Sequence, residues 1–569
     1  MGNNVDPTEP WRKIVETIKK DFKRWEARHP TLEGKRLIVQ MIAGGKTQFL
    51  ARAQGMPETI QDEIHRTITE FVWGKERASM SIKDAAQDPK RGGRKIMNIV
   101  RRNEAVDLMW VKQYLNMGKD RPKWAFMMDE IFRMAWPKNA TVTHWMVEKW
   151  NPLTQDWRPK TKSEYISKRI QNAMKLAKKH DVDLEALEPN EETKRGLPVW
   201  LHRKANKEAA RIYATNGAKC LKLRHRTHYI GQLTDLIEGL PDDHREMNFC
   251  TCKMCEDASR LGCNHPHKCI ETARRLIDSL APKWRPGGNQ SIRPGAPGPG
   301  APNVESLKDG IEIDTHREAT NLRDSIRIFT KKENLLSATT LRTSEDETQT
   351  SVEETVYTDG SCVNNGTDDA KAGIGVWFGP RDPRNMAGRV PGRQQSNQVG
   401  ELLAILYAIK NTPGNQPLRI VSDSKFALEG LTTYAKEWEK RDWIGVTHGP
   451  LFKCTTAWLR ARTATTTLQW VKGHAGIEGN EGADKLAAEG AQKDPDPDLD
   501  EIDLRIPADT MTTGAALTQI SQSLLYHHLT NAQPIESYHT TIAGKSEDSS
   551  KRRDRGDPDK RSGMDEYET

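Results

Sequence analysis

The amino-acid sequence predicts an α/β domain over residues 351–494, preceded by a mainly helical segment and a small cluster of cysteine and histidine residues. Three observations predict this architecture. Short β-branched runs alternate with helical patterns toward the C-terminal side, apolar residues recur at helical spacing near the N-terminus, and five of the eight cysteines fall within residues 250–269. Since domains average about 150 residues, a chain of 569 residues has room for several.

The composition indicates compact domains separated by solvated segments. Hydrophobic residues make up 36% of the chain and charged residues 29%, which is polar for a globular protein. The formal net charge of +8 suits a polyanionic partner. No apolar stretch approaches the roughly 18 residues of a membrane span, and the first ten residues lack the features of a signal peptide. We therefore expect an intracellular, monomeric protein that binds no membrane, in either the nucleus or the cytoplasm.

Residues 1–120 are helical in pattern. Apolar residues recur at helical spacing from Trp11 to Trp25, and a second amphipathic run begins after Pro57 and stops at Gly74. Both runs predict the buried sides of helices. Residues 121–245 are a mixed spacer, rich in Trp, Lys and Arg, whose elements the pattern leaves unassigned.

A Cys/His cluster occupies residues 246–283. It contains a C-x₂-C pair and, after a short loop, further cysteines and histidines, which is a pattern typical of tetrahedral Zn²⁺. There are more candidates than positions, so we expect a structural zinc ion bound by four of the following residues: Cys252, Cys255, Cys263, His267 and Cys269. The alternative is a set of unligated cysteines or redox chemistry, although so many neighbouring free thiols would be unusual.

Two polar regions flank the α/β domain. Residues 284–350 begin with a Pro/Gly-rich stretch that holds neither a helix nor a strand, and they continue as a polar segment. Residues 495–569 begin with an acidic run and end in mixed charges. These patterns predict a linker and a largely disordered tail.

Four acidic residues stand in four short motifs of the α/β domain. Asp359 and Asp423 each end a β-branched run, as expected of carboxylates at strand ends. Glu401 opens a helical pattern, and Asp484 lies in another, ten residues after His474. Each motif alone is commonly only a turn or a glycine loop. Carboxylate oxygens are the ligands that Mg²⁺ prefers, however, and two ions about 3.5–4 Å apart can hold both oxygens of a phosphoryl displacement. The ordered set therefore predicts a two-metal nuclease.

The motifs TDGS, GEL, SDS and WVKGHAGIEGNEGADKLA, in this order, resemble those of the type 1 ribonuclease H family. The resemblance covers residues 353–492 and implies a mixed five-stranded sheet flanked by helices. It implies that two Mg²⁺ ions, with Mn²⁺ as a substitute, bind to Asp359, Glu401, Asp423 and Asp484. It also implies that His474, on a mobile loop, assists proton transfer or product release. The residues expected to contact an RNA–DNA hybrid are Ser361, Asn365 and Asn397.

The expected activity is endonucleolytic hydrolysis of the RNA strand of RNA–DNA hybrids, which leaves 5′-phosphate and 3′-hydroxyl ends. Telling RNA from DNA requires contacts to 2′-hydroxyl groups in a wide, shallow minor groove, which suits short polar side chains. A further hypothesis is a basic and aromatic ridge that binds the DNA strand. Its residues would be Lys425, Lys436, Trp438, Lys440, Arg441 and Trp443. The alternative for this ridge is ordinary helix packing beside a solvated face.

Residues 10–280 resemble the region that follows the palm in LINE-type, non-LTR reverse transcriptases, especially fungal ones. The run from Trp25 to Lys75 and the segment 197–202 carry this resemblance. It implies that residues 1–120 correspond to a thumb and connection, in a truncated element without polymerase activity, since the sequence holds no Tyr-x-Asp-Asp motif. Two other functions compete with hybrid cleavage: a catalytically silent nucleic-acid-binding remnant of a retrotransposon, and a DNA transposase or integrase on the same fold.

Overall fold

The computed structural model describes most of the chain, in two compact units. The described residues are 6–74, 80–135, 151–156, 166–247, 250–287, 304–313, 319–331, 335–336, 352–496 and 500–531. The first unit comprises the described residues up to Val106 together with those from Leu525, and the second comprises those from Asp107 to Leu524. Within this part of the chain, no helix is both long and apolar enough to cross a membrane.

The first unit is a group of helices around one apolar core. Its helices are α1 (Glu9–Glu26), α2 (Leu32–Val39), the π-helical turn η1 (Gln40–Gly44), α3 (Gly45–Gln54), α4 (Glu58–Trp73), α5 (Ile82–Ala85), the 3₁₀ turn η2 (Pro89–Arg91) and the start of α6 (Ile99–Tyr114). The apolar faces of α1 and α4 meet in the core, where the rings of Phe22 and Phe71 stack with centroids 4.3 Å apart. The two predicted helix sides are thus buried, and Pro57 and Gly74 flank α4.

The chain returns to this unit in its last described helix, α22 (Gln522–Asn531). The backbone N–H of Asn98 donates to the hydroxyl of Tyr526 at 3.0 Å, and that of Asp88 donates to the side chain of Asn531 at 3.1 Å. The prediction of a disordered tail from residue 495 is therefore wrong for residues 500–531. Residues 532–569 lie outside the described part.

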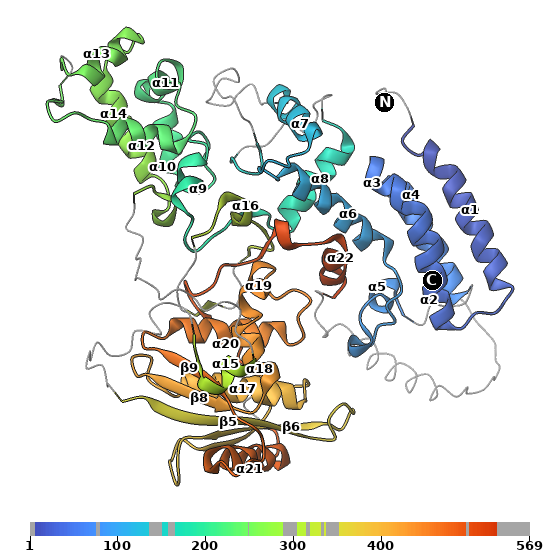
Figure 1. The fold of residues 1–569 in the computed structure, drawn as a ribbon. Coiled ribbons are helices and arrows are strands. Elements are labelled where there is room, and N and C mark those ends of the chain that lie inside the picture. Colours follow the sequence, from blue (N-terminus) through green and yellow to red (C-terminus); the bar gives the residue numbers. More distant parts are fainter. Residues whose placement is uncertain are drawn as a thin grey trace, which may run out of the picture. The chain divides into compact units, whose positions relative to one another are not determined.

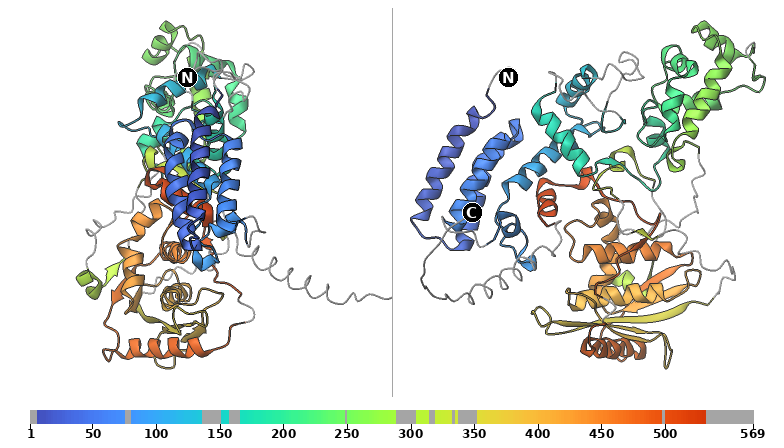
Figure 2. Two further views of the ribbon diagram at one scale, coloured as in Figure 1. Left: turned by 90° about the vertical axis from the view of Figure 1, so that its right-hand side faces the viewer. Right: turned by 180° about the vertical axis from the view of Figure 1, so that it is seen from behind.

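The spacer that the pattern left unassigned is mainly helical. Its elements are α7 (Lys123–Met134), α8 (Lys168–Lys179), β1 (Asp183–Leu184), α9 (Glu191–Gly196), α10 (Glu208–Tyr213), α11 (Asn216–Leu223) and α12 (Ile230–Glu238). The Cys/His cluster that follows contains α13 (Lys253–Arg260), α14 (Pro266–Asp278) and the 3₁₀ turn η4 (Pro282–Trp284). Helix α14 packs against α10, α11, α12 and α13, so it is the centre of this segment (Figure 2).

Parts of the predicted linker and tail form strands with the spacer. A three-stranded antiparallel sheet has the order β1, β3 (Ile326–Ile328), β11 (Ala515–Ala516), and α16 (Leu322–Ser325) precedes β3. A parallel pair joins β4 (Leu335–Leu336) to β10 (Ile506–Pro507), and η6 (Leu517–Gln519) follows β11. The predicted polar linker therefore contains short strands that pair with distant segments. Strands of two or three residues carry no detectable period, and their partners lie far away in the sequence.

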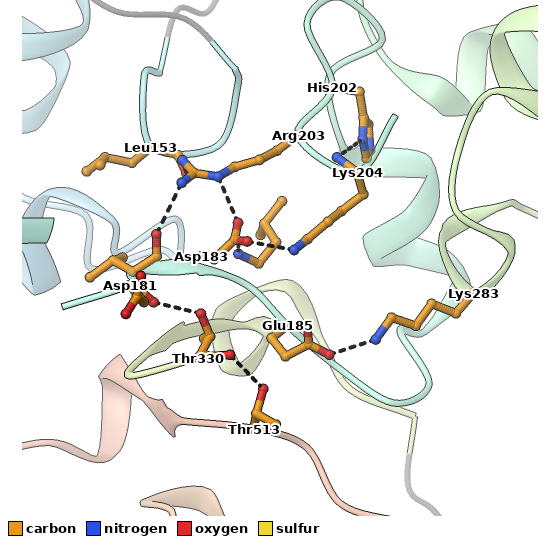
Figure 3. Close-up of polar contacts among 12 residues, drawn as sticks. Leu153, Asp181, Asp183, Glu185, His202, Arg203, Lys204, Lys283, Thr330 and Thr513 are labelled. Carbon is orange, nitrogen blue, oxygen red and sulfur yellow. Dashed lines mark hydrogen bonds and ion pairs between the residues drawn. The ribbon is translucent and has the colours of Figure 1, made fainter. Parts of the chain in front are cut away.

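Polar contacts connect the same segments (Figure 3). Asp183 accepts from Lys204 Nζ at 2.7 Å and forms an ion pair with Arg203 Nε at 2.7 Å. Glu185 forms an ion pair with Lys283 at 2.6 Å. The hydroxyl of Thr513 donates to the carbonyl of Thr330 at 3.1 Å. Polar contacts thus join the spacer to the Cys/His segment and the linker to the tail.

His202, beside these contacts, should make the protein sensitive to acid. Burial, and secondly the charge of Lys204, lower the pKa of His202 from 6.5 to about 4. Because its Nδ1 accepts from the N–H of Lys204 at 3.0 Å, the folded state needs the neutral imidazole. The stabilisation is therefore complete above pH 6.5 and is lost as the pH falls toward 4, by about 3 kcal/mol. Urea unfolding of wild type and of His202→Gln at pH 7 and pH 4 measures this loss of unfolding free energy. An equal loss in the two proteins would contradict the prediction.

The α/β domain contains a mixed sheet with the order β2, β9, β8, β5, β6, β7. Its strands are β2 (Ile311–Glu312), β5 (Glu354–Val363), β6 (Lys371–Trp377), β7 (Met386–Arg389), β8 (Leu418–Ser422) and β9 (Thr466–Trp470). Strand β5 pairs antiparallel with β6 and parallel with β8, and β8 pairs parallel with β9. The predicted mixed sheet is confirmed, but it has a sixth strand, because β2 from the predicted linker pairs with the edge strand β9.

Helices cover both faces of this sheet (Figure 1). They are α15 (Val304–Asp309), α17 (Asn397–Lys410), α18 (Lys425–Thr432), α19 (Ala435–Lys440), α20 (Gly449–Ala461) and α21 (Glu478–Gln492). Helix α21 lies on one face, against β5, β6 and β7, while α17, α18 and α20 lie on the opposite face. The core between sheet and helices includes Val356, Leu402, Ile420, Phe452 and Leu468, all fully buried.

Candidate active site

Asp359 and Asp423 come from neighbouring parallel strands. Thr358 of β5 lies opposite Ser422 of β8. The residue that follows each of them in the chain is one of the two aspartates, Asp359 and Asp423. Asp423 follows the end of β8 as predicted, and its carbonyl accepts from Trp470 Nε1 at 2.9 Å. Asp359, in contrast, lies in the middle of β5, because pairing with β6 continues to Val363. The prediction that it ends a strand is therefore wrong.

Glu401 reaches the same place from α17, whose N-terminus is capped by the hydroxyl of Ser396. It is the fifth residue of this helix and so lies in its second turn rather than in the expected first one. A Cβ atom added to Gly360 would lie 2.1 Å from the backbone nitrogen of Glu401. Glycine at this position of β5 thus allows the helix backbone to contact the strand directly, beside Asp359.

Asp484 is carried by α21 on the other face of the sheet. This helix also packs closely, since a Cβ on Gly375 of β6 would lie 2.0 Å from the carbonyl oxygen of Ala483. Gly375 is the register partner of Asp359. The close packing therefore places Asp484 beside Asp359, and the structure brings all four predicted carboxylates to one region.

Burial and neighbouring carboxylates raise the pKa values of Asp359 and Glu401. Burial first, then the charges of Asp423 and Asp484, raise the pKa of Asp359 to about 7. Burial first, then Asp359 and Asp423, raise the pKa of Glu401 well above its usual value. Both effects follow because neighbouring negative charges removed from water disfavour ionisation.

The donor set fits a divalent cation. Oxygen atoms of Asp359, Glu401 and Asp423 all lie within 4.8 Å of one another. Glu401 Oε2 is buried and has no hydrogen-bond partner among the described residues. Oxygen ligands at this spacing suit a hard ion such as Mg²⁺, whose charge would offset their repulsion. The structure thus contains a buried acidic triad of the kind that binds magnesium.

His474 lies on an exposed loop between β9 and α21. Its side chain is 78% exposed, and its Nδ1 lies 3.7 Å from Asp484 Oδ2. Its backbone φ of 51° is left-handed. Glu481 joins these two residues in a second potential cation-binding group and accepts from the backbone N–H of Gly476 at 3.3 Å. The loop is therefore attached to α21 through an acidic side chain.

Two residues of α21 belong to the site although the sequence analysis missed them. Glu481 is one, and the other is Asn480, whose Nδ2 donates to Asp423 Oδ2 at 3.4 Å. The Oδ1 of Asn480 is buried and accepts no hydrogen bond within the described chain. The available signal was spacing, because residues three and four positions before Asp484 share its helix face.

The three predicted hybrid-contacting residues lie near the carboxylates. Ser361 follows Asp359 by two positions in β5 and so faces the same side of the sheet. Asn365 Nδ2 donates to Asn397 Oδ1 at 3.1 Å, which joins the end of β5 to the start of α17. Both asparagines are exposed. They form a polar surface pair, although 32 positions separate them in the sequence.

The hypothesis of a basic and aromatic ridge is wrong for Trp443, but Trp438 is only partly buried. Trp443 is buried in the core of the domain. Trp438 packs against Phe452 with ring centroids 5.0 Å apart. Lys425 lies over the ring of Trp470, 4.6 Å from its centroid. Helix packing, the alternative interpretation, explains Trp443, whereas Trp438 stays partly exposed.

The predicted single zinc site is also wrong in its membership. The structure forms two groups whose ligand atoms lie within 4.8 Å of one another: Cys220, His225, Cys263 and Cys269 in one, and His244, Cys250, Cys252 and Cys255 in the other. His267 belongs to neither. The reason is that α14 packs against α11 and thereby brings Cys220 to Cys269, a contact that local spacing cannot reveal. Both groups could bind zinc.

Comparison with known proteins places the α/β domain in a family. A family model described as RNase H matches residues 351–492. Over 146 residues the chain is 40% identical to Ribonuclease H1 of Mus musculus. The matched region covers 25% of this chain and 51% of that protein. Over 143 residues it is 38% identical to Ribonuclease H of Schizosaccharomyces pombe. This matched region covers 25% of this chain and 53% of that protein. The chain spans about half the length of these curated relatives.

A shorter relative is matched over most of its length. The chain is 34% identical over 146 residues to Ribonuclease H of Alcanivorax borkumensis, covering 24% of this chain and 89% of that protein. The matched region contains the four carboxylates, the buried acidic triad among them, and the mixed sheet that positions them. Through residues 351–492, this chain belongs to the ribonuclease H family.

Proposed function

We propose that this protein hydrolyses the RNA strand of RNA–DNA hybrids endonucleolytically. The observation that carries the proposal is the convergence of four carboxylates from β5, α17, the end of β8 and α21. Three of them hold oxygen atoms within 4.8 Å of one another. So many buried acids at one place are costly unless a cation binds there, and membership of the ribonuclease H family supports the same reading.

The side chains of this site have separable roles. Asp359, Glu401, Asp423 and Asp484 would hold Mg²⁺, which when bound supplies an activated water and stabilises charge on the leaving 3′ oxygen. Asn480 donates to Asp423 and so holds one carboxylate in place. His474 is exposed and lies beside Asp484, where its imidazole can pass a proton to solvent.

The polar surface beside the acids supports an RNA-containing substrate. The amides of Asn365 and Asn397 are exposed and mutually hydrogen-bonded, so they present fixed donors and acceptors to a groove that carries 2′-hydroxyl groups. Side chains of this kind contact backbone and sugar, which predicts little sequence preference. The retroelement ancestry of residues 10–280 stays a prediction of the sequence alone.

Purified full-length protein with Mg²⁺ should cut a hybrid whose RNA strand is labelled and leave duplex DNA and duplex RNA intact. Asn365→Ala and Asn397→Ala should each raise KM for the hybrid about tenfold, which is the loss of about 1.4 kcal/mol of binding, with little change in kcat. Asn411→Ala, at the opposite end of α17, is the matched control and should behave as wild type.

Three results would contradict this proposal in different ways. Binding of the hybrid without any cleavage would favour the silent nucleic-acid-binding remnant. Equal cleavage of duplex DNA would favour a transposase-like or integrase-like enzyme. An unchanged KM in both asparagine variants would mean that the pair does not contact the substrate.

A further inference from the structure

Eight cysteine and histidine side chains between α11 and α14 form two sets of the same composition. Each set contains three thiols and one imidazole: Cys220, His225, Cys263 and Cys269 in the first, and His244, Cys250, Cys252 and Cys255 in the second. The second set lies between the two halves of the first in the sequence. Neither set belongs to the ribonuclease H domain, so the proposed nuclease chemistry leaves both unexplained.

In the second set, one imidazole nitrogen lies at nearly the same distance from three sulfur atoms. His244 Nδ1 lies 3.5 Å from Cys252 Sγ, 3.6 Å from Cys250 Sγ and 3.5 Å from Cys255 Sγ. An imidazole nitrogen has a single hydrogen or a single lone pair, so hydrogen bonding does not account for three contacts. A tetrahedral zinc ion with ordinary Zn–S and Zn–N distances would separate its sulfur and nitrogen ligands by about 3.5 Å. The observed spacing is that of ligands around such an ion.

In the first set, two of the three sulfur atoms lie at the spacing expected of ligands on one zinc ion. Cys263 Sγ and Cys269 Sγ lie 3.7 Å apart, and both side chains are buried. This separation is far from the roughly 2.05 Å of a disulfide and close to the about 3.8 Å between two thiolates on one zinc ion. His265 Nδ1 also lies 3.5 Å from Cys269 Sγ. The set whose ligand atoms are all mutually close, however, contains His225.

The packing of α13 shows why this segment needs ions. Of its eight residues, only Cys255 and Ala258 are buried. Leu261, which follows this helix, is exposed, as is Met247 in the preceding loop. Burial of so little apolar surface cannot offset the entropy of ordering the helix and its flanking loops. Metal ligation supplies folding free energy directly where a hydrophobic core is missing.

Other uses of the thiols fit less well. All eight cysteines of the chain are free, and three thiols in a set would leave one unpaired if a disulfide formed. An iron–sulfur cluster has several atoms between its cysteine ligands, which would hold the sulfur atoms farther apart than observed. Three thiolates and one imidazole around a single ion is a known structural zinc arrangement.

We propose that residues 220–269 bind two structural zinc ions, each through three cysteines and one histidine, with one site nested in sequence inside the other. The outer site joins α11 and the loop after it to α14. The inner site joins the loop before α13 to the first turn of α13. Because four protein ligands complete each site, neither ion has an open position for catalysis. The inner site holds α13 in place, a helix that buries only two of its own side chains.

The first test is the metal content of the full-length protein, purified without added chelator and measured by native mass spectrometry and elemental analysis. Two zinc ions per chain are expected. Cys220→Ser or His225→Ala should reduce the content to one, as should Cys250→Ser or His244→Ala, and a variant from each site combined should reduce it to none. His244→Cys, which keeps a zinc ligand, should retain both ions.

Matched controls distinguish ligands from neighbours. His267→Ala removes a histidine whose ring centroid lies 6.3 Å from that of His244 but which belongs to neither set. Cys454→Ser removes a buried thiol in α20. Both variants should keep two ions. Cobalt substitution gives a second readout, since each remaining Cys₃His site should contribute its own thiolate-to-metal absorption.

Several results would overturn the proposal. One ion per chain that is lost on His267→Ala would establish a single site shared by both groups. A metal-free protein with native circular dichroism, in which all six cysteines of the two sets react with an alkylating reagent, would exclude structural zinc. If every single-site variant lost both ions, and His244→Cys also failed to retain them, two separately ligated sites would be ruled out.

Discussion

Replacing Asp423 by Asn should lower the rate of hybrid cleavage about a thousand-fold or more. The substitution preserves shape but removes one of the charges that hold the cation, and loss of a single fixed electrostatic contact at a reacting centre costs about that much. Asp423 is well suited to the test because it contacts both halves of the site. Its Oδ2 accepts from Asn480, and its charge contributes to the raised pKa values of Asp359 and Glu401.

The same substitution should leave the fold intact. Removing one negative charge relieves repulsion in the metal-free protein, so Asp423→Asn should unfold in EDTA at a temperature equal to or above that of wild type. Addition of Mg²⁺ should raise the unfolding temperature of wild type more than that of the variant. Single-turnover cleavage and thermal unfolding measure these effects, with Asp368→Asn in the exposed turn after β5 as the control. Wild-type cleavage by Asp423→Asn would show that the acidic cluster is not the catalytic centre.

Replacing Gly360 by Ala should both destabilise the ribonuclease H domain and impair cleavage. The added Cβ would lie 2.1 Å from the nitrogen of Glu401, 2.6 Å from the carbonyl carbon of Gly400 and 2.7 Å from the carbonyl oxygen of Asn397. All three atoms belong to the backbone of α17, so no side chain can rotate away. The helix must shift, and overpacking of this kind costs about 3 kcal/mol. Glu401 and Asn397 move with the helix, so the rate should fall along with the stability.

Gly379→Ala is the matched control, because a Cβ at that position meets no atom within 4 Å. Urea unfolding and hybrid cleavage should both match wild type for the control and fall for Gly360→Ala. A Gly360→Ala variant with wild-type stability would mean that α17 does not pack on β5 as closely as the structure places it. Normal cleavage by a destabilised variant would show that the position of Glu401 is less critical than proposed.

The carboxylates of the candidate site could be predicted because each stands in a local motif with its own flanks. The β-branched run before Asp423 and the helical pattern around Asp484 correctly placed these two residues after a strand and in a helix. Asp359 was assigned to a strand end, because pattern cannot reveal that pairing with β6 extends the strand beyond it. Helical spacing places Asn480 on the same helix face as Asp484, but its contact with Asp423, 57 positions away, depends on the fold.

In the Cys/His region, too, the local sequence predicted the kind of site, while the ligand sets depended on tertiary packing. Residue types and a C-x₂-C pair suggested zinc, but not how many ions or which ligands. Cys220 and His225 lie well before the cluster, and His244 lies just before it, so spacing rules assigned none of them. The grouping follows only from the packing of α14 against α11. The strand β2 is comparable, since two residues of a polar stretch become part of a sheet only because β9 offers an open edge.

The sequence by itself determined the helical character of residues 1–120, the α/β character of residues 351–494, the four acids of the candidate site and the presence of metal-binding residue types. These properties are local, because hydrophobic period and short motifs are properties of neighbouring residues. Only the tertiary structure decided the sixth strand, the position of Asp359 within β5, the contacts of Asn480 and the division of the cysteines into two sets. Each of these depends on backbone packing between segments far apart in the chain, which no local pattern specifies.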